Sequence, residues 1–124
     1  MADIDPLLEL MERLRDKDKG CPWDIKQDHN SIAHCSIEEA YELVAAITKN
    51  DQENIKEELG DILLQVIFHS QIAKENNAFD FNDVVEVLSK KLITRHPNVF
   101  DPDFDLRISA VSYTHLRAHE TGYN

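Results

Sequence analysis

Hydrophobic residues recur along most of this chain at intervals of three or four positions, which is the spacing of one face of an α-helix. The pattern predicts four helices, at about residues 5–17, 36–50, 52–76 and 82–95, and no strand outside about the last twenty residues. The predicted fold class is therefore all-α, with the helices arranged like a four-helix bundle.

Capping residues set the expected helix starts. Asp51 is a suitable N-cap for the third helix, and Asp80 or Asn82 for the fourth. The segment Ser36-Ile37-Glu38-Glu39 fits a capping box at the start of the second helix, although that helix could equally begin near Ser31.

The third predicted helix is apolar around nearly its whole circumference. At about 100° per residue, its apolar side chains point in almost every direction. They are Leu59, Ile62, Leu63, Leu64, Val66, Ile67, Phe68 and Ile72. A four-helix chain of 124 residues has too little surface of its own to cover such a helix, so a second subunit is the natural source of the missing contacts. We therefore predict a homodimer or a higher homo-oligomer.

Composition narrows the class of partner. The 24 Asp and Glu residues against 13 Lys and Arg give a net charge of −11, which repels the phosphates of DNA or RNA duplexes and anionic membranes. The same charge attracts divalent cations, or a phosphorylated substrate that carries one. No apolar run reaches the length of a membrane span, and Cys21 and Cys35 lack zinc-site spacing, so we expect a cytoplasmic protein with free thiols.

Acidic residues on the second and third predicted helices are the sharpest chemical signal. Glu38, Glu39 and Glu42 make an E-E-x-x-E pattern, and Glu58 and Asp61 follow as E-x-x-D. Residues three or four apart share a helix face, so two adjacent antiparallel helices would bring four carboxylates together. Because such charges repel each other, a hard divalent cation such as Mg²⁺, which prefers oxygen ligands, would stabilise the cluster.

A solvated acidic helix face is the common alternative for such residues. On the helical wheel, however, Asp61 lies between Phe68 and Ile72, which favours a carboxylate embedded among apolar neighbours. Glu42 is expected to face solvent.

Two basic residues form an i,i+4 pair near the end of the fourth predicted helix, namely Lys91 and Arg95. This position suits an anionic ligand, so the pair could hold phosphate oxygens. Ordinary stabilisation of the helix end by basic side chains explains the pair equally well.

The remaining candidate side chains are isolated. The histidines at positions 29, 34, 69 and 96 lack the spacing of a metal site, so surface or hydrogen-bonded core positions are expected for them. Trp23 is expected to pack onto the helices, with stacking on a nucleobase as the alternative.

Together these blocks resemble the MazG family of nucleoside triphosphate pyrophosphohydrolases, all-α enzymes that split a nucleoside triphosphate into monophosphate and pyrophosphate. The resemblance covers about residues 4–103. Besides the two acidic patterns it rests on Met11-Glu12-Arg13-Leu14-Arg15, Gly20-Cys21-Pro22-Trp23-Asp24, Phe79-Asp80-Phe81-Asn82-Asp83 and Arg95-His96-Pro97-Asn98-Val99-Phe100.

The resemblance implies a role for each charged residue of these patterns. The implied ligands of Mg²⁺ are Glu39, Glu42, Glu58 and Asp61. Glu38 and Glu39 are the implied catalytic carboxylates, with Glu38 orienting a water, and the implied contacts to the substrate phosphates come from Lys91 and Arg95. The implied reaction is attack of a metal-activated water on the triphosphate, without a covalent intermediate.

Domain organisation leaves a second hypothesis open. Members of this family often carry two such domains in tandem, and the Cys-Pro-Trp-Asp and Arg-His-Pro blocks resemble the first copy. The alternative is therefore a non-catalytic, dimerising first domain that positions a second domain of a longer tandem protein. We place the MazG-like domain at residues 1–104 and leave 105–124 unassigned, because that tail is unlike the family and looks like a non-native addition.

Overall fold

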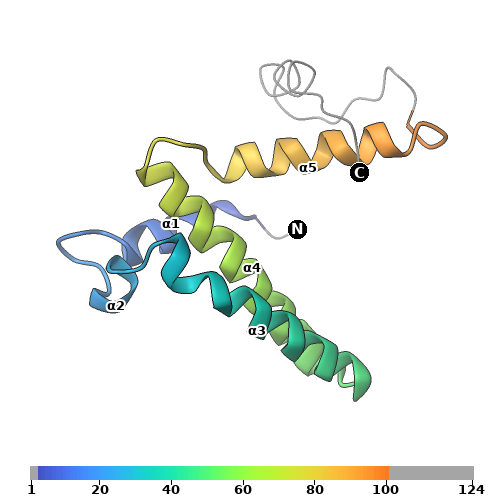
Figure 1. Cartoon of the computed structure of the whole chain (residues 1–124), viewed down its shortest axis with the longest axis horizontal. Coiled ribbons are helices and arrows are strands. Elements are labelled where there is room, and N and C mark those ends of the chain that lie inside the picture. The colour runs from blue at the N-terminus through green and yellow to red at the C-terminus, as the bar shows by residue number, and fades with distance from the viewer. Residues whose placement is uncertain (1–2, 101–124) are drawn as a thin grey trace. The chain divides into compact units, whose positions relative to one another are not determined.

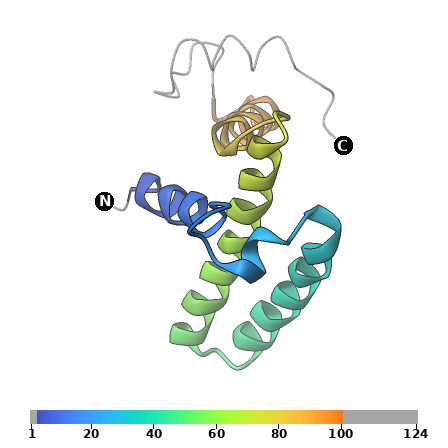
Figure 2. The same ribbon diagram turned by 90° about the vertical axis from the view of Figure 1, so that its left-hand side faces the viewer.

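The computed structural model describes residues 3–100, and within them it contains five helices and no strand (Figures 1 and 2). The helices are α1 (Asp5–Leu14), α2 (Pro22–Ile25), α3 (His29–Thr48), α4 (Gln52–Glu75) and α5 (Phe81–Arg95). The predicted all-α fold class is confirmed. The tail at 105–124 lies outside the described residues, as do the last residues of the domain predicted at 1–104. No helix in the described range is long and apolar enough to cross a membrane.

The chain divides into two compact units, one ending at Ala78 and one beginning at Phe79, and each is described by itself. In the first unit α3 and α4 pack side by side and antiparallel, and α1 contacts α4 (Figure 2). A short turn joins α3 to α4, in which Asn50 adopts a positive φ of 54° that asparagine tolerates better than most residues. The described part of the second unit contains α5.

The N-caps explain where the helices begin. Asp51 caps α4 by accepting a hydrogen bond from the Asn54 amide, and Asp80 forms a capping box with Asp83 at the start of α5, so both predicted caps are confirmed. The capping box predicted at Ser36-Ile37-Glu38-Glu39 is wrong, because this segment lies inside α3.

The second predicted helix instead begins at His29, close to the Ser31 alternative. Asp28 is its N-cap: the Asp28 carboxylate accepts from the Ser31 amide, and the Ser31 hydroxyl accepts from the Asp28 amide, both at 2.8 Å. A serine followed three residues later by glutamate is a local pattern that a helix interior also tolerates. Sequence spacing therefore could not tell an interior position from a cap.

The first helix ends at Leu14, three residues earlier than predicted, because the chain folds back on itself. The Cys21 amide donates to the Leu14 carbonyl at 2.8 Å, and the Gly20 amide donates to the Asp16 carbonyl at 2.8 Å. A Cβ atom on Gly20 would lie 2.4 Å from the Leu14 oxygen, so this close approach of backbone requires glycine.

Most of the core of the first unit comes from α1, the start of α3 and the second half of α4, and Ala46 is buried near the other end of α3. Its buried hydrophobic residues are Met11, Ile32, Ala46, Ile67, Phe68, Ile72 and Ala73. Trp23 is not among them: its side chain is 58% exposed, so the expectation that it packs onto the helices is wrong. The one-turn helix α2 that carries Trp23 is attached by polar contacts to its backbone rather than by its indole ring.

Those polar contacts come from Arg15, whose side chain is only 7% exposed. Its Nε and Nη2 atoms donate to the two carboxylate oxygens of Glu75, each at 2.8 Å, which is a bidentate ion pair between the end of α1 and the end of α4. Its Nη1 atom donates to the carbonyls of Asp24 and Gln27, at 2.6 and 3.2 Å. The guanidinium also lies 5.4 Å from the centre of the Phe68 ring. One side chain therefore connects α1, α2 and α4.

Replacing Arg15 with alanine should lower the free energy of unfolding by about 2 kcal/mol, because it removes charge-assisted hydrogen bonds and leaves two carbonyls without their donor. Arg13→Ala is the matched control: Arg13 is 80% exposed and 3.8 Å from Glu9, so its loss should cost less than about 0.5 kcal/mol. Urea unfolding at pH 7 measures both values, and equal losses would contradict the role of Arg15.

The same pair gives a pH dependence of known sign. The hydrogen bonds from Arg15 hold the pKa of Glu75 below its ordinary value of 4.5. A carboxylate with a depressed pKa stabilises the folded state above its unfolded pKa, and this contribution is lost as the pH falls through the folded-state pKa. The difference in stability between the wild type and Arg15→Ala should therefore shrink below about pH 4.5.

Candidate metal centre

Three carboxylates from the two packed helices meet in the first unit. Glu39 lies on α3, and Glu58 and Asp61 lie one turn apart on α4. One oxygen of each lies within 4.8 Å of the other two. Antiparallel packing of α3 and α4 brings E-E-x-x-E opposite E-x-x-D. The helical spacing predicted four converging carboxylates, and Glu42 is the one that is not part of this trio.

The carboxylates differ in burial, and not in the expected order. Glu58 is buried, with 9% of its surface exposed, whereas Asp61 is exposed. The expectation that Asp61 is the embedded carboxylate is wrong. Its neighbours on the helical wheel, Phe68 and Ile72, are buried because the apolar core covers α4 only further along, around residues 67–73. Glu42 is exposed, as expected.

Burial and mutual repulsion perturb two of these groups. Burial first, and then repulsion from Glu42, Glu39 and Asp61, raises the pKa of Glu58 to about 7. Burial, followed by repulsion from Asp61 and Glu42, also raises the pKa of Glu39. Glu42 is therefore close enough to act on both groups electrostatically.

Two oxygens of the cluster, Glu39 Oε2 and Glu58 Oε1, are buried without a hydrogen-bond partner among the described residues. Buried acceptors normally have a partner, and either a proton shared between Glu39 and Glu58 or a bound cation would supply one. The donor set consists of carboxylate oxygens, which suits a hard divalent cation such as Mg²⁺. The residues present therefore fit the implied metal.

Glu38 lies on the exposed side of α3. One of its oxygens lies within 4.8 Å of ligand atoms of His34 and Cys35, and its charge contributes to the raised pKa of Glu39. Glu38 is thus beside the three carboxylates without being one of them, which is compatible with a role next to a bound ion.

The predicted phosphate-binding pair lies on α5, in the second unit. Lys91 is exposed and Arg95 is partly buried, and burial lowers the pKa of Arg95. Their spacing places them one turn apart near the end of the helix, as predicted. Their approach to the carboxylates stays a prediction.

Two residues that had been assigned only ordinary positions form a specific contact. The Nδ1 atoms of His29 and His69 lie 2.7 Å apart, and the rings stack with centres 5.0 Å apart and planes 8° from parallel. Burial, and then the charge of His29, lowers the pKa of His69. This hydrogen bond ties the start of α3 to α4. Forty residues separate the two histidines, so no local pattern could have revealed the pair.

Comparison with known proteins identifies the family to which the sequence is similar. The sequence model of the family described as MazG nucleotide pyrophosphohydrolase domain matches residues 27–100, a range that contains both acidic patterns and α5. The nucleoside triphosphate pyrophosphohydrolase of Escherichia coli (strain K12) is 49% identical over 100 residues, which are 81% of this chain and 38% of that protein.

Two further relatives with names for the same activity are also similar to this chain. The nucleoside triphosphate pyrophosphohydrolase/pyrophosphatase MazG of Thermotoga maritima is 52% identical over 97 residues, 78% of this chain and 38% of that one. The nucleoside triphosphate pyrophosphohydrolase of Mycobacterium tuberculosis is 39% identical over 92 residues, 73% of this chain and 27% of that one. The chain thus spans less than two-fifths of the length of these relatives.

Without divalent cations, Glu58 should make the protein less stable as the pH rises. Between its ordinary pKa of 4.5 and its folded-state pKa of about 7, the folded protein holds a proton that the unfolded chain has released. The free energy of unfolding should therefore fall across this window. Glu58→Gln should reduce this fall, whereas Glu57→Gln, at the exposed neighbouring position, should not.

Urea unfolding of chelator-treated protein at several pH values between 4.5 and 7.5 measures these slopes. Identical slopes for wild type and Glu58→Gln would mean that the cluster is hydrated and unperturbed.

Proposed function

The chain belongs to the MazG nucleotide pyrophosphohydrolase domain family, and from this premise we propose that it hydrolyses nucleoside triphosphates to nucleoside monophosphate and pyrophosphate with Mg²⁺. The observation that carries the proposal is the trio of Glu39, Glu58 and Asp61, with two buried oxygens that have no hydrogen-bond partner among the described residues. Relatives that align over 73–81% of this chain are named for this reaction.

In this proposal the metal is held by Glu39, Glu42, Glu58 and Asp61. When bound, Mg²⁺ supplies positive charge to the phosphate oxygens and lowers the pKa of a water. A cation held there would favour the ionised form of Glu58, whose pKa is raised first by burial and then by the neighbouring carboxylates.

The chain's own groups then orient the reactants. Glu38 and Glu39 are the catalytic carboxylates: Glu39 is directed toward the other two acids, and Glu38, exposed beside it, accepts a hydrogen bond from the attacking water and receives its proton. Lys91 and Arg95 bind the phosphate oxygens of the substrate. Their positive charge stabilises the negative charge that develops on the leaving pyrophosphate. We also propose a cytoplasmic location, because both cysteines are free thiols and the cytoplasm is reducing.

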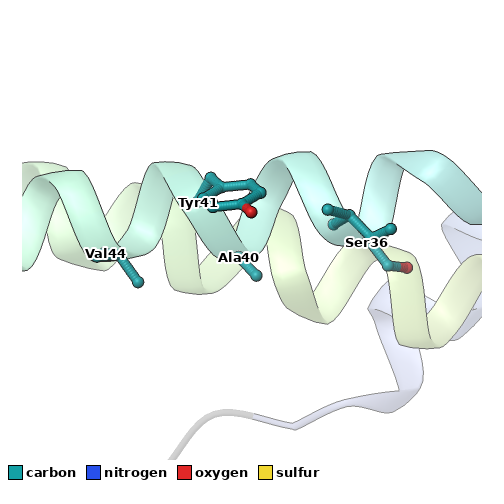
Figure 3. A pocket seen from close by; sticks show the side chains of 5 residues that line it. Ser36, Ala40, Tyr41 and Val44 are labelled. Carbon is teal, nitrogen blue, oxygen red and sulfur yellow. The ribbon is translucent and has the colours of Figure 1, made fainter.

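A homodimer is part of the proposal, because the helix pair leaves large apolar side chains exposed. On α3 the side chains of Ile37, Tyr41 and Val44 are 63%, 72% and 58% exposed. With Ser36 and Ala40 they line a shallow depression of about 380 Å³, and Figure 3 shows Ala40, Tyr41 and Val44 in a row along the helix. On α4, Leu59 is 52% exposed. Contiguous apolar surface of this kind normally marks an interface.

Removing a cluster carboxylate should abolish catalysis and spare the fold. Glu58→Gln and Asp61→Asn are each expected to lower the rate of pyrophosphate release by at least about a hundredfold, since a loss of several kcal/mol of charge stabilisation corresponds to such a factor. Stability without metal should stay equal or rise slightly, because repulsion is relieved. Glu57→Gln should retain full activity.

A coupled assay for pyrophosphate with several nucleoside triphosphates, alongside circular dichroism, measures both effects. Parallel loss of activity and helicity would mean that the acids hold the structure together. No release with any nucleotide from folded wild-type dimer would overturn the enzymatic function and favour the non-catalytic first-domain alternative.

The dimer is tested by placing a charge on the exposed face of α3. Val44→Glu should convert the protein to a monomer in sedimentation velocity experiments, because an interface core does not accept an unpaired carboxylate. Ala45→Glu introduces the same charge about 100° further round the helix and should leave the dimer in place. A wild-type monomer at micromolar concentration would contradict the dimer.

A further inference from the structure

A small pocket of about 240 Å³ opens between α3 and α4 beside the carboxylates. Ser36 from α3 lines one side, and Ile62, Gln65, Val66 and His69 from α4 line the other. None of these residues belongs to the acidic patterns.

The register of the two helices places this pocket next to the carboxylate trio. Ser36 precedes Glu39 by three residues on α3, and Gln65 and His69 follow Asp61 by four and eight residues on α4. At 1.5 Å of rise per residue, the α4 side of the pocket extends from about 1.5 Å beyond Asp61, at Ile62, to about 12 Å, at His69. The pocket and the carboxylates therefore lie within about two helical turns of each other along the same pair of helices.

The pocket differs from the carboxylate trio in charge. Ile62 and Val66 supply apolar walls, and Ser36 and Gln65 are polar and neutral. Burial lowers the pKa of His69, which favours its neutral ring, and the hydrogen bond to His29 holds that ring in place. A pocket without a cation does not suit phosphate groups, and it does suit an uncharged, partly polar group.

Gln65 indicates what that group offers. Its Oε1 atom is buried and has no hydrogen-bond partner among the described residues. A buried amide oxygen normally accepts a hydrogen bond, so a donor on a ligand would complete it. Each of the common nucleobases presents at least one N–H donor on its edge, beside a flat aromatic face.

We propose that this pocket binds the nucleoside end of the substrate, and that the Gln65 side-chain amide hydrogen-bonds the edge of the base while Ile62 and Val66 contact its face. The assignment rests on the proposed function, since it takes the phosphates to lie at the carboxylates. A second copy of the chain is the less suitable occupant, because it would have to insert a donor into a pocket already lined by both helices of one subunit.

Calorimetric titration with adenosine monophosphate and, separately, with pyrophosphate, both with Mg²⁺, tests the assignment on the full chain. Gln65→Leu should weaken adenosine monophosphate binding about tenfold, the cost of one lost hydrogen bond, and leave pyrophosphate binding unchanged. In turnover with adenosine triphosphate it should raise KM with little change in kcat. Gln52→Leu, at an exposed position on the same helix, should change neither.

Ser36→Leu is a second variant in case Gln65→Leu folds poorly. Ser36 is exposed on α3, and leucine is a good helix former, so the fold should persist while the larger side chain fills the pocket. It too should weaken adenosine monophosphate binding selectively.

The possible outcomes distinguish failure of the proposed nucleoside pocket from failure of the proposed reaction. Wild-type pyrophosphate release with unchanged nucleotide affinity in both variants would overturn the pocket and leave the proposed function standing. Selective loss of adenosine monophosphate binding in a protein that releases no pyrophosphate would support the pocket and overturn the proposed reaction. Equal weakening of adenosine monophosphate and pyrophosphate binding, or no binding of the monophosphate by the wild type, would overturn the pocket.

Discussion

Repulsion between carboxylates is the constraint on which the rest of this structure depends. Packing α3 against α4 brings Glu39, Glu58 and Asp61 to within 4.8 Å of one another, and partial burial deprives them of the water that would screen their charge. The helices can keep this arrangement only if a proton or a cation neutralises part of it. The raised pKa of Glu58 corresponds to neutralisation by a proton, and the function we propose requires neutralisation by a divalent ion. In that proposal, ion binding and stability are coupled at this end of the helix pair.

Contacts at the opposite end of α4 stabilise the fold and offset the cost of that repulsion. There Phe68, Ile72 and Ala73 are buried, and Arg15 pairs with both oxygens of Glu75 while it also holds the backbone after α2. The charge of Glu75 is matched by Arg15 at this end, whereas the carboxylate trio at the other end has no ion-pair partner among the described residues. Such a division is common in functional proteins, where satisfied contacts in one region offset an unsatisfied site elsewhere.

Between these ends, the residues that line the helix pair change from charged to neutral within about two helical turns of α4. The pocket lined by Gln65 and His69 comes after the carboxylates along α4, and His69 is hydrogen-bonded to His29. A substrate with an anionic end and an uncharged, hydrogen-bonding end matches this order of chemistry. A triphosphate attached to a nucleoside has that form.

The sequence by itself determined the presence of the four longer helices, the caps at Asp51 and Asp80, and the facing of E-E-x-x-E by E-x-x-D, because periodicity, capping and i,i+3 spacing are local properties of a chain. It did not reveal the one-turn helix α2 or the start of α3 at His29. Only the tertiary structure decided which carboxylate is buried, that Trp23 is exposed, and that His29 meets His69. The burial of a residue depends on which other elements pack against it, and not only on its neighbours on the same helix. A helical wheel places Asp61 among apolar neighbours correctly, yet those neighbours face the core two and three turns further along the helix, where Asp61 does not reach.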